Sequence, residues 1–169
     1  MTIRFLILSV LSFFILAGCT PKPITLSAHD GKFLPVDLGP AASMISMDVQ
    51  VFLTSFSSGN PWRSAAYVGL YQAPDRDNSF QIVIVRNAPS DNFLLVGYRI
   101  IEMGRETTRV ATLESVPANK PVDISLFFSK GKVTLSVNGG QPVQVDTKLS
   151  EVIPYASVSS GTAQFVKRS

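Results

Sequence analysis

Apolar and polar residues alternate over several short segments of the chain, which indicates β-strands that bury one face. Between residues 44 and 51, isoleucine, methionine and valine alternate with serine, aspartate and glutamine. Segments 133–137 and 143–146 repeat the same period of two. We therefore predict a strand with one polar and one apolar face in each of these three segments.

Three other segments are apolar at nearly every position, namely 65–71, 80–85 and 93–101. Continuous apolar runs of this length are typical of strands that are covered on both faces. They are also expected in strands that lie beside a concave binding face. The sequence alone leaves both interpretations open.

Turn-forming residues separate these segments, which bounds the fold class. Asn138-Gly139 and Lys130-Gly131 favour tight hairpins because asparagine and glycine tolerate positive φ angles. After residue 18 no long segment has a helical period, although residues 149–155 suit one short helical turn before Pro154. Many short strands with Gly/Pro turns predict an all-β sandwich or barrel.

The N-terminus has the pattern of a signal peptide. Residues 5–17 form an apolar run after Arg4, shorter than the roughly 20 residues of a membrane span and suited to a signal peptide. The following Leu16-Ala17-Gly18-Cys19 resembles the lipobox of bacterial lipoproteins. That resemblance implies a diacylglyceryl group on the thiol of Cys19, cleavage after Gly18 and acylation of the new amine. Two or more acyl chains anchor a protein stably to a membrane.

The lipobox also implies a domain organisation and a location. We expect a signal peptide over residues 1–18, a lipidated N-terminus and tether over 19–23, and a single β-sandwich domain over 24–169. In Gram-negative bacteria an aspartate after the lipidated cysteine retains a lipoprotein at the inner membrane. Thr20 stands there instead, so we expect a cell-envelope protein that is lipid-anchored at the outer membrane.

Charge and cysteine content exclude some alternatives. The formal net charge is +3, and the basic residues are scattered rather than gathered as in a nucleic-acid-binding surface. The single cysteine, Cys19, is the expected lipidation site, so no disulfide staples the fold. The domain therefore depends on an apolar core.

The last third of the chain carries a family resemblance. Residues 122–146 contain an amphipathic segment, a Gly turn and then the sequence VTLSVNG at 133–139. This resembles laminin-G-like domains of the concanavalin A-like lectin superfamily, and residues 157–166 resemble their closing strand. The resemblance implies a jelly-roll sandwich of two antiparallel sheets, one of them curved.

Candidate ligand-binding residues are aromatic or basic. Trp62 lies in the loop sequence GNPWRS, where it suits stacking on a sugar ring or anchoring a protein partner. The alternative is a loop aromatic folded onto the edge of the sandwich. Tyr71, Tyr98 and Arg99 lie in expected strands and are candidates to line a concave face, the alternative being a core or strand-edge role.

A calcium site is a further candidate. Asp75, Asp77 and Asn78 form the oxygen-rich sequence PDRDN, and laminin-G-like domains often bind calcium with carboxylates at a loop rim. Calcium takes six to eight oxygen ligands, and this segment supplies only three side chains. The alternative is an Asx turn.

Catalytic signals are weak in this sequence. Glycosidases of the superfamily carry an E-x-D-x-x-E motif, because glycoside hydrolysis uses a pair of carboxyl groups. No glutamate of this chain forms that motif; the four are Glu102, Glu106, Glu114 and Glu151. His29 is the only histidine, and its neighbour Asp30 is too close in sequence for the geometry of a catalytic triad.

We therefore expect a non-enzymatic, membrane-anchored binding module for a glycan or a protein partner. One alternative is a structural or assembly lipoprotein of an envelope complex, and a weaker one is a carbohydrate-active enzyme. Exposed aromatic residues on a concave sheet would favour the binding module. A flat apolar patch would favour the structural protein, and two facing carboxyl groups in a cleft would favour the enzyme.

Overall fold

A computed structural model describes residues 22–56, 63–88 and 90–168, and these residues form ten β-strands. All strand pairs are antiparallel. No helix in the described ranges is long and apolar enough to cross a membrane. The strands are β1 (Ile24–Asp37), β2 (Met44–Phe56), β3 (Ala65–Gln72), β4 (Ser79–Val85), β5 (Phe93–Glu102), β6 (Arg105–Pro117), β7 (Val122–Ser129), β8 (Lys132–Val137), β9 (Val143–Asp146) and β10 (Val152–Lys167).

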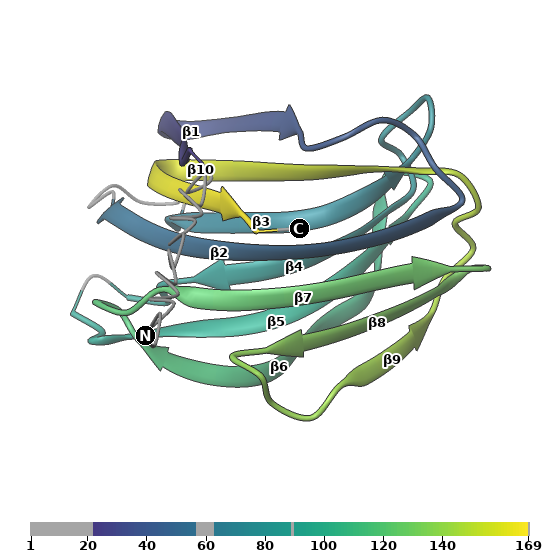
Figure 1. The fold of residues 1–169 in the computed structure, drawn as a ribbon. Coiled ribbons are helices and arrows are strands. Elements are labelled where there is room, and N and C mark those ends of the chain that lie inside the picture. The colour runs from purple at the N-terminus through teal and green to yellow at the C-terminus, as the bar shows by residue number, and fades with distance from the viewer. Residues whose placement is uncertain (1–21, 57–62, 89, 169) are drawn as a thin grey trace, which may run out of the picture.

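The strands form one continuous ladder that folds over into two layers (Figure 1). The order is β6-β5-β4-β3-β10-β2-β7-β8-β9, and β1 pairs with β10. The long strand β10 pairs with β3 through its first half and with β2 through its second half. The all-β, two-layer antiparallel sandwich expected from the sequence is thus confirmed.

Two strands turn the corner between the layers, because each bends near its middle. In β10 the bend lies at Ser160, whose φ is 49°, and Gly161 follows it. In β1 the register shifts between Ala28 and Phe33, around Gly31 with a φ of 73°. Positive φ angles of this kind let a strand change direction sharply, so both strands belong to both layers.

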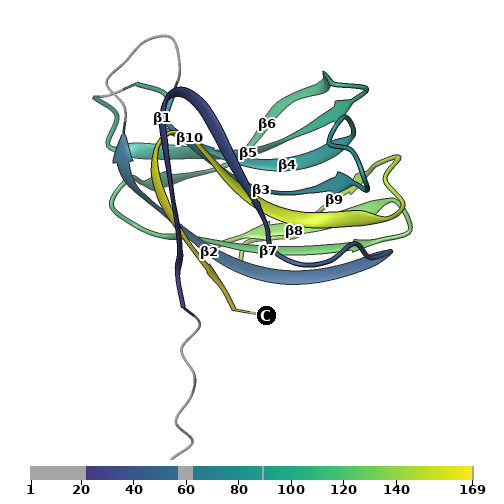
Figure 2. The same cartoon turned by 90° about the horizontal axis from the view of Figure 1, so that it is seen from above.

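We call the layer of β6, β5, β4, β3 and the first half of β10 the concave sheet. The layer of β9, β8, β7, β2 and the second half of β10 is the convex sheet. Figure 2 shows that both layers curve in the same sense, so the outer face is hollow on one sheet and bulging on the other. The three segments that are apolar at nearly every position correspond to β3, β4 and β5 of the concave sheet. The alternating segments lie in β2, β8 and β9 of the convex sheet.

The hydrophobic core fills the space between the layers. Its largest fully buried side chains include Phe80 of the concave sheet, Phe128 of the convex sheet and Phe165 of β10. Aromatic side chains of this size remove the most apolar area from water, which is the main favourable term in folding. The alternating segment 44–51 contributes Met47 and Val49 to this core, as its period of two predicted.

The tight turns lie where the sequence has residues that tolerate positive φ angles. The predicted β7–β8 hairpin is confirmed, since Lys130 and Gly131 have φ angles of 51° and 73°. Asn138 and Gly139 also have positive φ angles, 49° and 71°, after β8. The helical turn expected within residues 149–155 is wrong, because β10 begins at Val152 and this segment pairs with β3 instead.

Candidate functional site

The outer face of the concave sheet is unusual, because several of its side chains are buried although no third layer formed by the described residues covers them. Tyr155, Gly69 and Gln81 lie side by side across β10, β3 and β4, and Arg99 of β5 comes next. Tyr155 is only 3% exposed and Gln81 only 6%. Large neighbouring side chains therefore close over this face and leave a pocket between them.

The pocket has a volume of about 140 Å³. Its residues come from β1, from the consecutive β3, β3–β4 loop and β4, and from β10, so three regions far apart in sequence build it. Their side chains combine three aromatic rings, two neutral polar groups and one guanidinium. The lining residues are Phe33, Tyr71, Arg76, Ser79, Gln81 and Tyr155.

Two tyrosines and an arginine form one side of this pocket. The rings of Tyr71 and Tyr155 meet edge to face, with centroids 5.7 Å apart. The guanidinium carbon of Arg76 lies 4.4 Å from the Tyr71 ring centroid and 5.7 Å from that of Tyr155. A cation over an aromatic face is attracted by the ring quadrupole, so the arginine is held against both rings.

Asp37 of β1 links the arginine and the tyrosine. Arg76 Nη2 lies 2.9 Å from Asp37 Oδ1. The hydroxyl of Tyr71 donates to the same carboxylate, at 3.1 Å from each oxygen. The carboxylate therefore orients both side chains at the β1 edge of the pocket.

Glycine at position 69 is required by the close approach of the Phe80 backbone carbonyl and, to a lesser extent, of the Tyr155 ring. A Cβ atom there would lie 2.4 Å from the carbonyl oxygen of Phe80 and 3.0 Å from Cε1 of Tyr155. Side chains do not tolerate contacts this short. Gly69 thus makes room for the Tyr155 ring against the backbone of β3.

A second arginine continues the polar surface toward β5. Arg99 Nε donates to Gln81 Oε1 at 2.8 Å, and Arg99 Nη1 lies 3.3 Å from Glu106 Oε2. Gln81 Nε2 in turn donates to Ser79 Oγ at 3.2 Å. The guanidinium carbon of Arg99 lies 5.3 Å from the ring centroid of Tyr67. The floor of the face is therefore a chain of hydrogen bonds between neutral and charged groups.

Both tyrosines that line the pocket hold their protons more tightly than usual. Burial raises the pKa of Tyr155 above its ordinary value, because the interior disfavours the phenolate. Burial also raises the pKa of Tyr71, and the hydrogen bond to Asp37 adds to the rise. Both hydroxyls are accordingly neutral at physiological pH.

Of the predicted ligand-binding residues, the structure brings two together on this face. Tyr71 lines the pocket, and Arg99 is hydrogen-bonded to Gln81 in its floor. Tyr98 lies on the opposite face, where its ring stacks on Phe80 with centroids 5.6 Å apart. Successive residues of a strand point to opposite faces, so Tyr98 and Arg99 do not share a binding surface.

The sequence analysis missed Asp37 and five of the six described lining residues, namely Phe33, Arg76, Ser79, Gln81 and Tyr155. Gln81 had a detectable signal, because it is a lone polar residue within the apolar segment 80–85. Tyr155 lay in a segment interpreted as a helical turn. Phe33 and Arg76 carried no local signal, since only the pairing of β1 with β10 and the path of the β3–β4 loop bring them to the pocket.

The predicted calcium ligands form a turn. Asp75 Oδ1 accepts a hydrogen bond from the backbone N–H of Asp77 at 3.1 Å, and Asn78 Oδ1 accepts one from the N–H of Met103 at 2.9 Å. Across the described residues, no group of three or more His, Cys, Asp or Glu side chains is arranged to hold a metal ion. Calcium binding stays a prediction; in the structure Asp75 closes a turn within the β3–β4 loop, and Asn78 fastens that loop to the β5–β6 turn.

Two predicted residues, Cys19 and Trp62, lie outside the described residues. The lipidation site and the loop aromatic therefore stay predictions.

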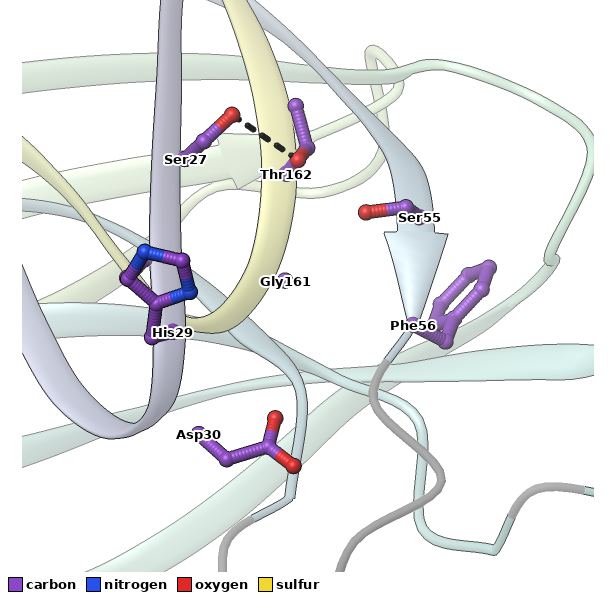
Figure 3. Close-up of a pocket in the computed structure, with 8 residues that line it drawn as sticks. Ser27, His29, Asp30, Ser55, Phe56, Gly161 and Thr162 are labelled. Atoms are coloured by element: carbon purple, nitrogen blue, oxygen red, sulfur yellow. Dashed lines mark hydrogen bonds between the residues drawn. The ribbon is translucent and has the colours of Figure 1, made fainter.

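A larger depression of about 660 Å³ lies at the corner where β1 and β10 change layers (Figure 3). It is lined by His29 and Asp30 of β1, by the end of β2, and by Gly161 and Thr162 of β10. Figure 3 shows the side chains of His29 and Asp30 pointing in different directions. A hydrogen bond of 2.9 Å joins Ser27 Oγ to Thr162 Oγ1 and fastens the two corner strands.

No known protein family and no curated protein sequence matches this chain. Solved structures do match its fold. The carbohydrate-binding module CBM66 from Bacillus subtilis gives a TM-score of 0.58 at 13% identity, covering 89% of this chain and 98% of that one. The carbohydrate recognition domain of Emp46p gives 0.55 at 9% identity and covers 86% of each chain.

An enzyme also contains this fold. Xylan β-1,4-xylosidase from Bacillus halodurans matches with a TM-score of 0.54 at 11% identity, over 76% of this chain but only 28% of that one. At these identities the similarity establishes the fold alone. The chain has the jelly-roll sandwich of lectin-type and carbohydrate-binding domains.

Proposed function

We propose that this protein is a non-enzymatic binding module that holds a glycan on the outer face of its concave sheet. The observation that carries the proposal is the pocket of Tyr71, Tyr155, Phe33 and Arg76, in which aromatic rings and hydrogen-bonding groups converge. The fold shared with carbohydrate-binding domains supports the same function.

The chemistry of the pocket suits a sugar. One face of a sugar ring is made of C–H groups and packs on aromatic rings, while its hydroxyls need both donors and acceptors. Phe33 is 45% exposed and offers an accessible ring at the pocket rim. Asp37 and Gln81 offer oxygen acceptors, and Arg76 and Arg99 offer donors. Convergent polar groups in a mainly aromatic hollow are typical of small-ligand sites.

A binding role fits the described pockets better than hydrolysis does. Glycoside hydrolysis needs two carboxyl groups across a cleft, about 5 Å or more apart. Among the described lining residues of the corner depression, Asp30 is the only acidic one. The pocket at Tyr71 has no acidic residue among its described lining residues. Glu102 and Glu106 are engaged by Lys148 and Arg99 instead.

We also propose that lipid on Cys19 anchors the domain to the bacterial cell envelope, at the outer membrane. The LAGC sequence supports this proposal. The Cys19→Ser variant removes the acylated thiol and should therefore appear in the soluble fraction or remain unprocessed. Cell fractionation followed by a high-salt wash measures this, and a Ser variant that stays with the membranes would show that another feature anchors the protein.

The binding proposal is tested with the full chain, solubilised in a detergent without a sugar headgroup and screened against immobilised polysaccharides with calcium or with a chelator. We expect at least one polysaccharide to bind. Tyr71→Ala should weaken binding by about 1–3 kcal/mol, as expected for an aromatic anchor. Phe127→Ala is the matched control, because Phe127 lies on the convex sheet and is 43% exposed.

Thermal melts of both variants separate lost contacts from lost folding. A Tyr71→Ala protein that melts near the wild-type temperature and still binds as tightly would exclude the concave pocket. A screen without any binding would favour the structural envelope lipoprotein. Polysaccharide binding that depends on calcium would support the predicted calcium site at Asp75, Asp77 and Asn78.

A further inference from the structure

The charged groups around the concave pocket are already paired with one another. Of the six described residues that line the pocket, Arg76 alone carries a charge, and it lies 2.9 Å from Asp37. Arg99, which borders the floor, lies 3.3 Å from Glu106. Arg76 and Arg99 therefore each have a carboxylate partner.

These pairs set which ligands the pocket accepts. A ligand carboxylate or sulfate that approached Arg76 would compete for its guanidinium with Asp37, which the fold already holds in place without an entropic cost of association. It would also face the negative charge of Asp37 at close range, and like charges brought together at an interface weaken binding strongly. An anionic group therefore gains little at this site.

A neutral hydroxyl meets no such conflict. It is both a donor and an acceptor, so it can donate to Asp37 and accept from Arg76 while the ion pair stays intact. The pair is accessible for this, since the side chains of Arg76 and Asp37 are 42% and 46% exposed. Hydrogen bonds to charged partners are stronger than those between neutral groups.

We propose that the concave pocket selects neutral glycans and rejects anionic ones, with Asp37 as the residue that determines this specificity. The inference rests on the proposed glycan-binding function, and it assigns a substrate class to that same site.

The test compares four neutral polysaccharides, namely a β-glucan, a xylan, a galactomannan and a galactan, each with its carboxymethylated derivative. The full chain should bind at least one parent polymer about tenfold or more tightly than the derivative at low salt. Asp37→Asn should reduce this preference severalfold, and its binding to the derivative should weaken as salt is added, because an unpaired Arg76 is then available. Asp146→Asn is the control, since Asp146 lies in β9 of the convex sheet and pairs with Lys132 at 3.8 Å.

The outcomes separate the two proposals. Tighter binding of the carboxymethylated polymers by the wild-type chain would overturn the neutral-glycan specificity and leave glycan binding in place. An unchanged preference in Asp37→Asn, with a wild-type melting temperature, would remove Asp37 as its cause. Binding of no polymer from either set would overturn the glycan-binding function itself.

Discussion

The two sheets of this sandwich share one core but differ in their outer faces. On the convex sheet, the outward positions of β2 and β7 carry polar residues such as Ser46, Gln50 and Ser125, as on an ordinary solvated surface. On the concave sheet, the outward positions carry Tyr155 and Gln81, which are nearly as inaccessible as core residues. Strand pairing alone does not explain the difference, because both sheets are antiparallel.

Curvature explains the difference. Side chains on a bulging face diverge and remain in water, whereas those on a hollow face converge and cover one another. Figure 2 shows the curvature of the two layers. Tyr71, Tyr155 and Arg76 meet in this way, although they come from different segments. The hollow face therefore buries side chains as the core does, and the pocket at Tyr71 and Tyr155 is the part of it that remains open.

The largest expected difference between the two sheets comes from removing one aromatic residue from each outer face. Tyr155→Ala should lower the free energy of unfolding by about 3–5 kcal/mol, the range for a buried aromatic residue, because Tyr155 is 3% exposed. Phe127→Ala, on the convex face, should cost less than about 1 kcal/mol. Urea denaturation measures both values. Similar losses for the two variants would show that the concave face is no more interior than the convex one.

A smaller effect is expected from adding a single methyl group to the concave face. Gly69→Ala should destabilise by about 1–3 kcal/mol, because its Cβ would overlap the Phe80 carbonyl and press on Tyr155. Gly39→Ala is the matched control, since its Cβ would lie 3.4 Å from Pro154 Cγ, an ordinary contact. Its stability should stay within about 1 kcal/mol of wild type. Equal melting temperatures for the two variants would contradict the packing of Tyr155 against β3.

The smallest effect is a pH dependence that appears only in alkali. The pKa values of Tyr71 and Tyr155 are raised in the folded protein, mainly by burial, above the ordinary value of 10.0. Below that value both states keep the proton, so stability is unaffected. As the pH rises above about 10, the unfolded chain loses these protons first, and stability falls.

Unfolding by guanidinium chloride between pH 8 and pH 11 measures this loss of stability. In Tyr155→Phe the ring remains but the titrating hydroxyl is gone, so the alkaline decline should become shallower. A wild-type protein whose stability stays flat up to pH 11 would contradict the burial of the tyrosine hydroxyls on the concave face.

Much of the fold was predictable because strand patterns are local. The alternation over 44–51 identified part of β2, and the runs that are apolar at nearly every position identified β3, β4 and β5. The sequence also offered a concave binding face as one reason for those runs; the three strands do lie in the concave sheet, and binding there stays a prediction. The strand β6 escaped prediction because polar and apolar residues do not alternate cleanly over Arg105–Pro117. This strand lies at the edge of the sheet, and its register against β5 shifts.

The sequence by itself determined most of β2, β3, β4, β5, β8 and β9, the face of the alternating strands that enters the core, and the tight turns at Lys130-Gly131 and Asn138-Gly139. These properties depend on side-chain polarity and on φ preferences within a few residues. Only the tertiary structure decided that Asp37, Arg76, Tyr71 and Tyr155 meet in one pocket. That meeting depends on the bend of β1 and β10 and on the curvature of the sheet, which arise from the packing of all ten described strands together.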